Sequence, residues 1–289
     1  MTILILGCGA VGKLVAEKEL TRGHRVVAVT QRSETIPDVD SFLINFDDSP
    51  QTYPRLPEAE SIYCFYPPPP TGQADFRTRH VITFLTSWKR KPRRVVLIST
   101  TSVYGDCEGE WVDESRSPNP QTDRAKRRLD AEKQWEQWTN EVGCELLTLR
   151  VAGIYGPDKL PKARLSRGEP MPRASESPFS NRIHIEDLVD VCLAAMHRGI
   201  PGLYNVSDGH PSTMVDYFHQ VADVLGMPRL PEVSMNEAQQ KMSPAMRSYL
   251  SESRRLMNDK LLGQLGITLK YPNLKTGLAA CVKGSYRAV

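Results

Sequence analysis

Three glycines near the start of the chain have the spacing of a phosphate-binding loop. They directly follow the apolar segment Ile3–Leu6 and precede a helical pattern. In such a loop the first glycine permits a tight turn, the second lets the backbone approach a pyrophosphate, and the third lets the helix pack on the strand. The helix N-terminus then offers unpaired N–H groups to the phosphates. The glycines could simply form a turn, but we predict a dinucleotide site at Gly7, Cys8, Gly9, Ala10, Val11 and Gly12.

The end of the second apolar segment indicates which dinucleotide would bind. Val26–Val29 continues into Thr30-Gln31-Arg32-Ser33. NAD-selective sites usually place an acidic residue there to bind the ribose 2′-hydroxyl, and this run has none. Arg32 could instead form a charge-assisted contact with a 2′-phosphate, or it could be a solvated loop residue. We therefore expect NADP(H) to be the preferred cofactor, with NAD(H) as the alternative.

Further motifs follow in an order that is typical of one superfamily. A Ser/Thr-rich run follows the apolar segment Val95–Ile98, and a Gly/Tyr-rich run follows Leu146–Leu149. The motifs are Ser99–Gly105, Arg150–Pro157, Arg182–Asp187, Tyr204–Val206, Arg255–Asn258, Leu262–Gly266 and Tyr271-Pro272. Together with the glycine loop they resemble the NAD-dependent epimerase/dehydratase-like, extended or atypical branch of the short-chain dehydrogenase/reductase superfamily. The resemblance covers nearly the whole chain.

The resemblance implies roles for residues that follow several of the strands. Thr100 stands three residues before Val103, where the family places the Ser or Thr that hydrogen-bonds the substrate oxygen. Turn formation is the alternative explanation of this Ser/Thr run. The family's positions around the adenine, ribose and nicotinamide correspond here to Tyr66, Pro67, Ser99 and Ile154.

The chain departs from the family at its catalytic pair. The family needs a Tyr and a Lys four residues apart on one helix, so that the ammonium lowers the pKa of the phenol and also holds the nicotinamide ribose. At this spacing the chain has Thr122 and Lys126, with Arg127 and Arg128 as nearby alternatives. We expect Lys126 to contact the ribose. Thr122, although it occupies the catalytic position, cannot act as the acid or base because an aliphatic hydroxyl is far less acidic than a phenol.

Two other tyrosines precede a lysine by four residues. They are Tyr155 with Lys159 and Tyr271 with Lys275, and each pair encloses a proline. A proline disfavours the continuous helix that gives this spacing its meaning, so we discount both pairs. We also expect no metal site at His184 and Asp187. They are better suited to capping a helix, and no further ligand lies at metal-binding spacing.

The elements that must position these residues follow from the hydrophobic pattern. Short apolar runs alternate with amphipathic stretches over the first half of the chain, which predicts a Rossmann-type α/β fold with a doubly wound parallel sheet. We expect a dinucleotide-binding core over 1–156. A small, mostly helical substrate-side region over 157–289 would be interleaved with that core as one structural unit. Within it, residues 157–180 are expected to form a surface segment. The Trp135 and Trp138 stripe predicts packing in the core or in a dimer.

The composition excludes several classes of protein. The 289 residues carry a net charge of only +3, so we expect no nucleic-acid or membrane partner. The six cysteines are scattered without a CxxC pair, which fits a reducing cytoplasm. No apolar run is long enough to span a bilayer. The expected partners are a small-molecule substrate and, as an open possibility, a second copy of the chain.

Three functions remain open from the sequence. The first is an NADP(H)-dependent oxidoreductase that acts on a small carbonyl or hydroxyl compound, such as a sugar derivative. The second is an epimerase or dehydratase that reduces and reoxidises its cofactor within one cycle. The third is a catalytically silent NADP(H)-binding sensor, because such a protein would keep the glycine loop and lack the catalytic tyrosine.

Overall fold

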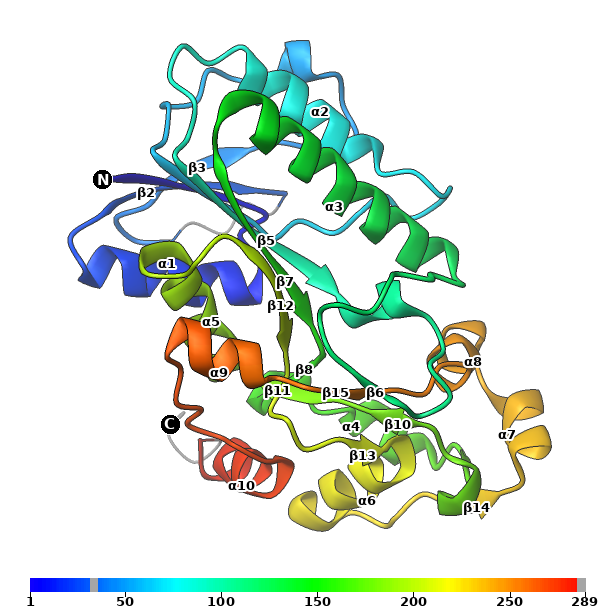
Figure 1. Cartoon of the computed structure of the whole chain (residues 1–289). Coiled ribbons are helices and arrows are strands. Elements are labelled where there is room, and N and C mark those ends of the chain that lie inside the picture. The colour runs from blue at the N-terminus through cyan, green and yellow to red at the C-terminus, as the bar shows by residue number, and fades with distance from the viewer. Residues whose placement is uncertain (32–35, 285–289) are drawn as a thin grey trace.

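A seven-stranded parallel sheet forms the centre of the molecule (Figure 1). The computed structural model describes residues 1–31 and 36–284. The strand order is β12-β7-β5-β4-β1-β2-β3. The strands are β1 (Thr2–Leu6), β2 (Arg25–Thr30), β3 (Asp40–Leu43), β4 (Ser61–Cys64), β5 (Arg94–Thr100), β7 (Glu145–Val151) and β12 (Gly202–Val206). Of these, β1, β2, β5 and β7 coincide with the apolar runs named above to within a few residues, and the Rossmann-type fold is confirmed.

Helices cover both faces of this sheet. Figure 1 shows α2 (Phe76–Thr86) and α3 (Asp123–Val142) on one face, with α1 (Ala10–Thr21) and α5 (Ile185–His197) on the other. Side chains alternate between the faces along each strand, so Ile3 and Ile5 pack beneath α1 and α5, and Leu4 and Leu6 pack toward α2 and α3. Two covered faces explain why the strands are apolar throughout.

The tryptophan stripe of α3 belongs to the core. Trp135 and Trp138 are buried with α2 and the sheet, and the indole N–H of Trp138 donates to the hydroxyl of Thr86 at 3.0 Å. Of the two predicted uses of this stripe, the structure shows core packing.

The connectivity creates one reversal in the sheet. From β1 the chain first builds outward through β2 and β3, and then returns to add β4 on the opposite side of β1. At such a switch point the loops after neighbouring strands diverge and leave a crevice at the carboxyl ends of the strands. The glycine loop follows β1 and therefore lies at this crevice.

The second half of the chain builds a smaller region from short elements. They are η3 (Pro157–Lys159), α4 (Lys162–Arg167), β9 (Met171–Pro172), η4 (Ala174–Glu176), β10 (Phe179–Ser180), β11 (Arg182–His184), β13 (Ser212–Thr213), α6 (Met214–Leu225), β14 (Glu232–Val233), α7 (Met235–Lys241), α8 (Pro244–Leu250), β15 (Arg255–Leu256) and α10 (Leu274–Gly284). Helix α9 (Asp259–Leu265) instead packs into the core of the main sheet. The remaining elements of the first half are η1 (Pro50–Thr52), η2 (Thr101–Tyr104), β6 (Trp111–Val112) and β8 (Gly153–Tyr155).

This region has a hydrophobic core of its own. Leu165 and Met171 are buried in it with residues of α6 and α10, so the expectation of a mere surface segment over 157–180 is wrong. The reason is long-range pairing, because Met171 aligns with Glu232 in a two-stranded sheet. In contrast, α5 and β12 come from the same half of the sequence and join the main sheet and its core. Among the described helices, none has the length and apolar character needed to cross a membrane.

Candidate functional site

The glycine loop has the three properties that a pyrophosphate requires. Gly7 has φ +91°, and a Cβ there would lie 2.4 Å from the backbone nitrogen of Tyr66. A Cβ on Gly12 would lie 3.2 Å from the carbonyl oxygen of Gly7, where α1 packs on the loop. Around Gly9, in contrast, no heavy atom lies within 4 Å of such a Cβ among the described residues. The backbone is therefore tight at the first and third glycines and open to a ligand at the second.

The N-terminus of α1 is prepared for an anion. Its N-cap residue is Gly9, so no side chain satisfies the first amides, and no acidic residue occupies the first turn. The unpaired amides and the positive end of the helix dipole therefore face the crevice. The loop itself is held in place because the amides of Gly7 and Cys8 donate to the carbonyl of Val29 at 3.0 and 2.9 Å.

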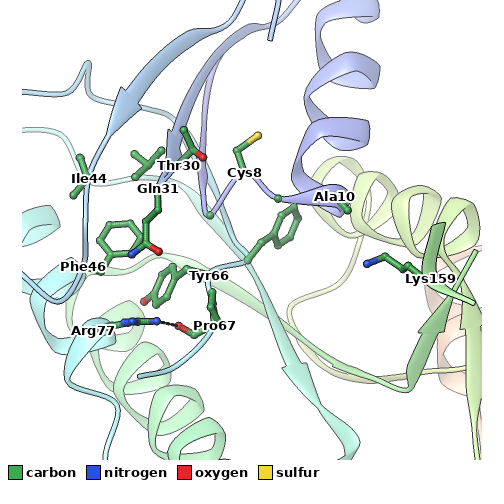
Figure 2. A pocket seen from close by; sticks show the side chains of 14 residues that line it. Cys8, Ala10, Thr30, Gln31, Ile44, Phe46, Tyr66, Pro67, Arg77 and Lys159 are labelled. Carbon is green, nitrogen blue, oxygen red and sulfur yellow. Dashed lines mark hydrogen bonds between the residues drawn. The ribbon is translucent and has the colours of Figure 1, made fainter. Parts of the chain in front are cut away.

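A cavity of about 480 Å³ lies in front of this loop, at the switch point (Figure 2). We call it the loop cavity. Its lining comes from the glycine loop, the ends of β2 and β4, and two residues after β3: Gly7, Cys8, Gly9, Ala10, Val29, Thr30, Gln31, Ile44, Phe46, Phe65, Tyr66, Pro67, Arg77 and Lys159. Tyr66 and Pro67 thus line the cavity beside the glycine loop, and their contact with the cofactor stays a prediction. The Tyr66 hydroxyl is bonded to Thr78 at 2.9 Å, so the residue lines the cavity without offering a free phenol.

The charges of the loop cavity are positive. Its described lining includes the cationic side chains of Arg77 and Lys159 and no carboxylate. Arg77 is paired with Asp47 at 2.5 Å, which holds the pKa of that carboxyl below its usual value through a hydrogen bond. At the end of β2, Gln31 lines the cavity and donates to Asn45 at 2.9 Å. Arg32, the predicted 2′-phosphate contact, lies outside the described residues.

A second cavity of about 360 Å³ lies at the carboxyl ends of β5 and β7. We call it the arginine cavity. Three predicted residues line it, namely Ser99, Thr100 and Ile154. The Thr100 hydroxyl accepts from the amide of Ser102 at 3.3 Å and so also starts the following turn, η2. Thr100 thus starts the turn and also lines a cavity, and its contact with a substrate oxygen stays a prediction.

Two partly buried guanidiniums of the arginine cavity lack a carboxylate partner within the described chain. Arg128 of α3 donates to the carbonyl of Tyr66 at 3.2 Å. Arg182 donates to the carbonyl of Asn181 at 2.9 Å and stacks over the Tyr217 ring at 4.1 Å. Desolvation lowers the pKa of both side chains. Since buried charges are normally paired, this arrangement is suited to an anionic ligand.

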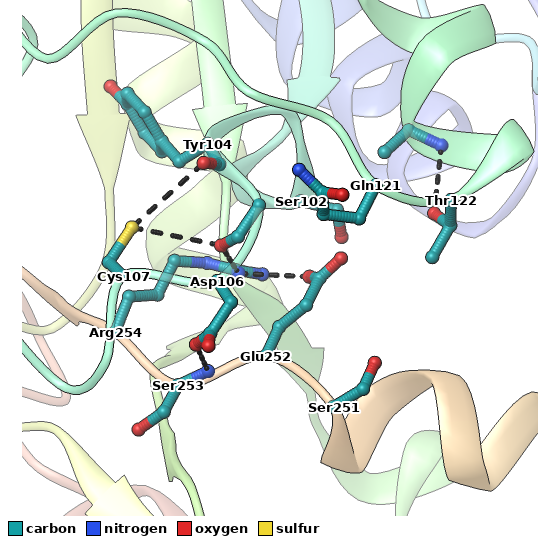
Figure 3. A network of polar contacts seen from close by, with 12 residues as sticks. Ser102, Tyr104, Asp106, Cys107, Gln121, Thr122, Ser251, Glu252, Ser253 and Arg254 are labelled. Carbon is teal, nitrogen blue, oxygen red and sulfur yellow. Dashed lines mark hydrogen bonds and ion pairs between the residues drawn. The ribbon is translucent and has the colours of Figure 1, made fainter.

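The predicted catalytic pair on α3 lies away from both cavities. The Thr122 hydroxyl accepts from the amide of Ala125 at 3.2 Å and caps the helix, as Figure 3 shows. Lys126 lies 3.9 Å from Asp123, and its side chain is 39% exposed. Neither residue is among those that line the loop cavity or the arginine cavity. Arg128, two residues after Lys126, lines the arginine cavity instead, and the roles of Thr122 and Lys126 stay predictions.

A polar network attaches the C-terminal segment to the Ser/Thr turn (Figure 3). Arg254 donates to the carbonyl of Gly105 at 2.6 Å and to Glu252 at 2.9 Å. The amide of Ser253 donates to Asp106 at 2.8 Å. Arg254 and Glu252 line the arginine cavity, where one carboxylate oxygen of Glu252 has no partner in the described chain. Arg255 is not part of that lining.

Behind the arginine cavity lies a buried ion pair. Arg150 donates to both carboxylate oxygens of Glu132, at 3.2 and 2.8 Å. The hydroxyl of Ser99 also donates to Glu132, and the guanidinium of Arg150 lies 4.6 Å from the centroid of the Tyr104 ring. The hydroxyl of Ser99 is thus already bonded within the protein, and this bond to Glu132 holds the end of β5 against α3.

Several residues of the two cavities were not identified from the sequence. Lys159 lines the loop cavity although the Tyr155–Lys159 spacing was discounted. That spacing does not lie on one helix, because Tyr155 is in β8 and Lys159 in η3, and Tyr271 likewise precedes α10. Arg182 and Tyr249 line the arginine cavity. Of these residues, only Arg182 could have been identified from the sequence, because it begins the motif Arg182–Asp187 that resembles the family.

Comparisons with known proteins agree with this architecture. Residues 70–207 match the model of the NAD dependent epimerase/dehydratase family. The Escherichia coli (strain K12) protein YeeZ is 25% identical over 288 residues, which covers 94% of this chain and 96% of that protein. A structure of a functionally unknown conserved protein from Silicibacter pomeroyi DSS is 28% identical, covers 98% of this chain and 99% of its own, and has a TM-score of 0.82.

Two further structures share the fold at lower identity. UDP-glucose 4-epimerase from Thermotoga maritima, solved with UDP-glucose, is 18% identical over 99% of each chain with a TM-score of 0.79. The human epimerase family protein SDR39U1, solved with NADPH, is 17% identical and covers 98% of this chain and 99% of its own, with a TM-score of 0.75. The resemblance expected from the sequence is confirmed, because part of the chain matches this family's model and these solved structures share the Rossmann-type fold.

Proposed function

We propose that this protein is an NADP(H)-dependent oxidoreductase whose substrate is a small carbonyl or hydroxyl compound that carries an anionic group. The observation behind the proposal is the pair of adjoining cavities at the carboxyl edge of the sheet. One contains the glycine loop, and the other contains Thr100 and two guanidiniums without a carboxylate partner in the described chain. A sugar derivative with a carboxylate or phosphate is one compound of this class.

Three observations support the cofactor part of the proposal. The glycine loop provides the pyrophosphate cradle, with Gly9 open to the cavity. The described lining of the loop cavity has no carboxylate that could bind a ribose 2′-hydroxyl. In addition, similar structures were solved with NADPH (human SDR39U1) or with NAD (MoeE5), which supports a nicotinamide dinucleotide as the cofactor class. In this proposal the preference for NADP(H) arises because Arg32 contacts the 2′-phosphate. Arg32→Ala should therefore erase the preference for NADPH over NADH.

The arginine cavity supplies the substrate side of the reaction. Arg182 and Arg128 bind the anionic group, because neither guanidinium is hydrogen-bonded to a carboxylate in the described chain. The hydroxyl of Thr100 donates to the substrate oxygen. A cation from the first turns of α3 holds the ribose. The sequence favours Lys126 for this contact, and the cavity lining favours Arg128. The nicotinamide, when bound, supplies or accepts a hydride.

Tyr249 of α8 is our candidate for the proton donor that α3 lacks. It lines the arginine cavity, and its ring lies 4.4 Å from the guanidinium carbon of Arg124. A phenol is a suitable acid for an alkoxide that forms in a reduction. In this proposal the family's tyrosine has been replaced by one from the C-terminal region. Tyr249→Phe should lower kcat about 100-fold and leave the affinity for NADPH unchanged.

Transfer of an isotope tests the proposed function without a known substrate. The purified protein is incubated with NADPH that carries deuterium at the transferable position, together with a small-molecule extract of its source organism. Mass spectrometry should then find an anionic metabolite that has gained one deuterium. If NADPH binds in the same sample and no metabolite is labelled, the oxidoreductase is excluded. The epimerase with internal redox cycling and the silent sensor would then remain.

A further inference from the structure

Two histidines and a buried glutamate gather at the edge of the sheet opposite to both cavities. Glu19 lies in the last turns of α1, His24 directly precedes β2, and His197 ends α5. The Glu19 side chain is fully buried, whereas the imidazoles of His24 and His197 are 19% and 27% exposed. The proposed oxidoreductase does not use this cluster, and the inference drawn from it is independent of that function.

The donor atoms of the three residues converge. Nδ1 of His24 lies 2.7 Å from Oε2 of Glu19, and Nε2 of His197 lies 2.9 and 3.0 Å from the two carboxylate oxygens. The two rings stack, with centroids 5.2 Å apart. One ligand atom from each residue lies within 4.8 Å of the others. Oε2 of Glu19 is thus in contact with a ring nitrogen from each side.

We propose that Glu19, His24 and His197 form a binding site for a zinc ion. Two imidazoles and one carboxylate are a ligand set that Zn²⁺ accepts while it keeps a fourth position for water. Bonds of about 2.0–2.2 Å in a tetrahedron hold the donor atoms about 3.3 Å apart. The ring nitrogens now lie 2.7 and 3.0 Å from Oε2 of Glu19, so each would move away from the carboxylate by roughly 0.3–0.6 Å. The ligand atoms of the two rings already lie within 4.8 Å of each other. Their partial exposure provides the entry path and the room for this movement.

The surroundings of Glu19 support a metal. The hydroxyl of Tyr63 donates to Oε1 of Glu19 at 2.5 Å, which orients the carboxylate and leaves Oε2 to the ion. Such a hydrogen bond to a ligand is usual around protein metal sites. The C-terminal ends of α1 and α5 both lie here, and their partial negative charge favours a cation. The positive charge of Arg22, which acts on Tyr63, lies on an exposed side chain that water screens.

A bound ion would join the helix that carries the glycine loop to α5. Because the ligands come from α1, from the start of β2 and from the end of α5, the ion stabilises the folded state only. The expected consequence is a rise of the unfolding temperature with zinc concentration.

Direct binding measurements test the site on the full-length chain without an affinity tag. The protein is freed of metal with a chelator and titrated with Zn²⁺ by calorimetry. Co²⁺ is then added to a second sample, because its visible absorption reports tetrahedral coordination. We expect one equivalent of Zn²⁺ to bind, a tetrahedral Co²⁺ spectrum that Zn²⁺ abolishes, and a zinc-dependent rise of the unfolding temperature.

Variants that keep the hydrogen bonds separate a metal site from a mere polar cluster. His24→Asn and His197→Gln each leave an amide N–H near the position of the lost ring nitrogen, so the fold should persist. Each should weaken zinc binding more than about 100-fold, and Tyr63→Phe should weaken it about 10- to 100-fold. His219→Gln is the matched control, because His219 lies 3.8 Å from Glu232 in the described chain without a third ligand. It should bind zinc like the unaltered protein.

Two results would overturn the proposal. One is the absence of zinc binding to the unaltered protein at concentrations up to about 1 mM. The other is equal zinc affinity in the unaltered protein, His24→Asn and His197→Gln. In either case the three residues form only a hydrogen-bonded cluster that fastens α1 to α5.

Discussion

Arg128 donates a hydrogen bond of 3.2 Å to the backbone carbonyl of Tyr66. Arg128 lines the arginine cavity, and Tyr66 lines the loop cavity, so this contact joins the two halves of the candidate site. It also places a guanidinium of α3 in the wall of the arginine cavity. Lys126, two residues earlier, lies instead beside Asp123 at the surface.

The first prediction concerns these two cations. Arg128→Gln should lower kcat/KM about 100-fold, because it removes a charge from the cavity wall and a link to the loop cavity. Lys126→Gln should have the smaller effect, and it is the matched control on the same helix. Steady-state kinetics with the substrate found by deuterium transfer decide between them. A larger loss in Lys126→Gln would assign the ribose contact to Lys126.

The second prediction concerns the glycine loop. Gly9→Ala should weaken NADPH binding at least about 10-fold, because the methyl group would occupy the space that the pyrophosphate approaches. The unfolding temperature should change little, since a Cβ at Gly9 meets no heavy atom within 4 Å in the described chain. Gly263→Ala in α9 is the control, because its Cβ is equally uncrowded and far from the loop in sequence. Fluorescence titration and thermal unfolding provide the two measurements, and unchanged affinity in Gly9→Ala would contradict the proposed cradle.

The third prediction concerns the buried ion pair. Glu132→Gln should lower the free energy of unfolding by about 3–5 kcal/mol, because it leaves the guanidinium of Arg150 buried without its counter-charge. The side chains of this pair are 10% and 5% exposed. In the surface pair of Asp223 and Arg229 they are 46% and 61% exposed, so Asp223→Asn should cost less than about 1 kcal/mol. Urea denaturation of both variants measures the difference. Similar small losses would show that Glu132 contributes no more than a surface carboxylate.

The fourth prediction is a pH dependence that Asp208 introduces. Burial raises the pKa of Asp208 to about 7, opposed by a hydrogen bond from the His210 amide and by the charges of His210 and Arg182. Asp187 adds to the rise. Because the folded state favours the protonated carboxyl, its stabilising contribution is complete below pH 4 and is lost as the pH rises through about 7.

Asp208→Asn removes this dependence. At pH 8 the free energy of unfolding of the variant should be about 2–4 kcal/mol higher than that of the unaltered protein. The difference should vanish near pH 4. Denaturant unfolding at several pH values follows the change. A difference that is constant with pH would show that Asp208 does not titrate in this range.

Local sequence patterns determined the central sheet and the loop that follows β1. Short apolar runs predicted the parallel strands because both faces of a parallel sheet are covered, so each strand carries the signal within its own few residues. The glycine loop is equally local, because the turn, the open backbone and the helix contact arise within six consecutive residues. The same is true of Thr100, which is the last residue of β5.

Only the tertiary structure decided which cations and acids face the cavities. Arg128, Arg182 and Tyr249 come from α3, β11 and α8, and they meet because those elements pack at one edge of the sheet. The orientation of α3 places Arg128 and not Lys126 in the cavity wall. Glu19 and His197 are separated by 178 positions, and their contact depends on the packing of α1 against α5. Spacing along a chain records contacts within one element, whereas contacts between elements depend on how the whole core packs.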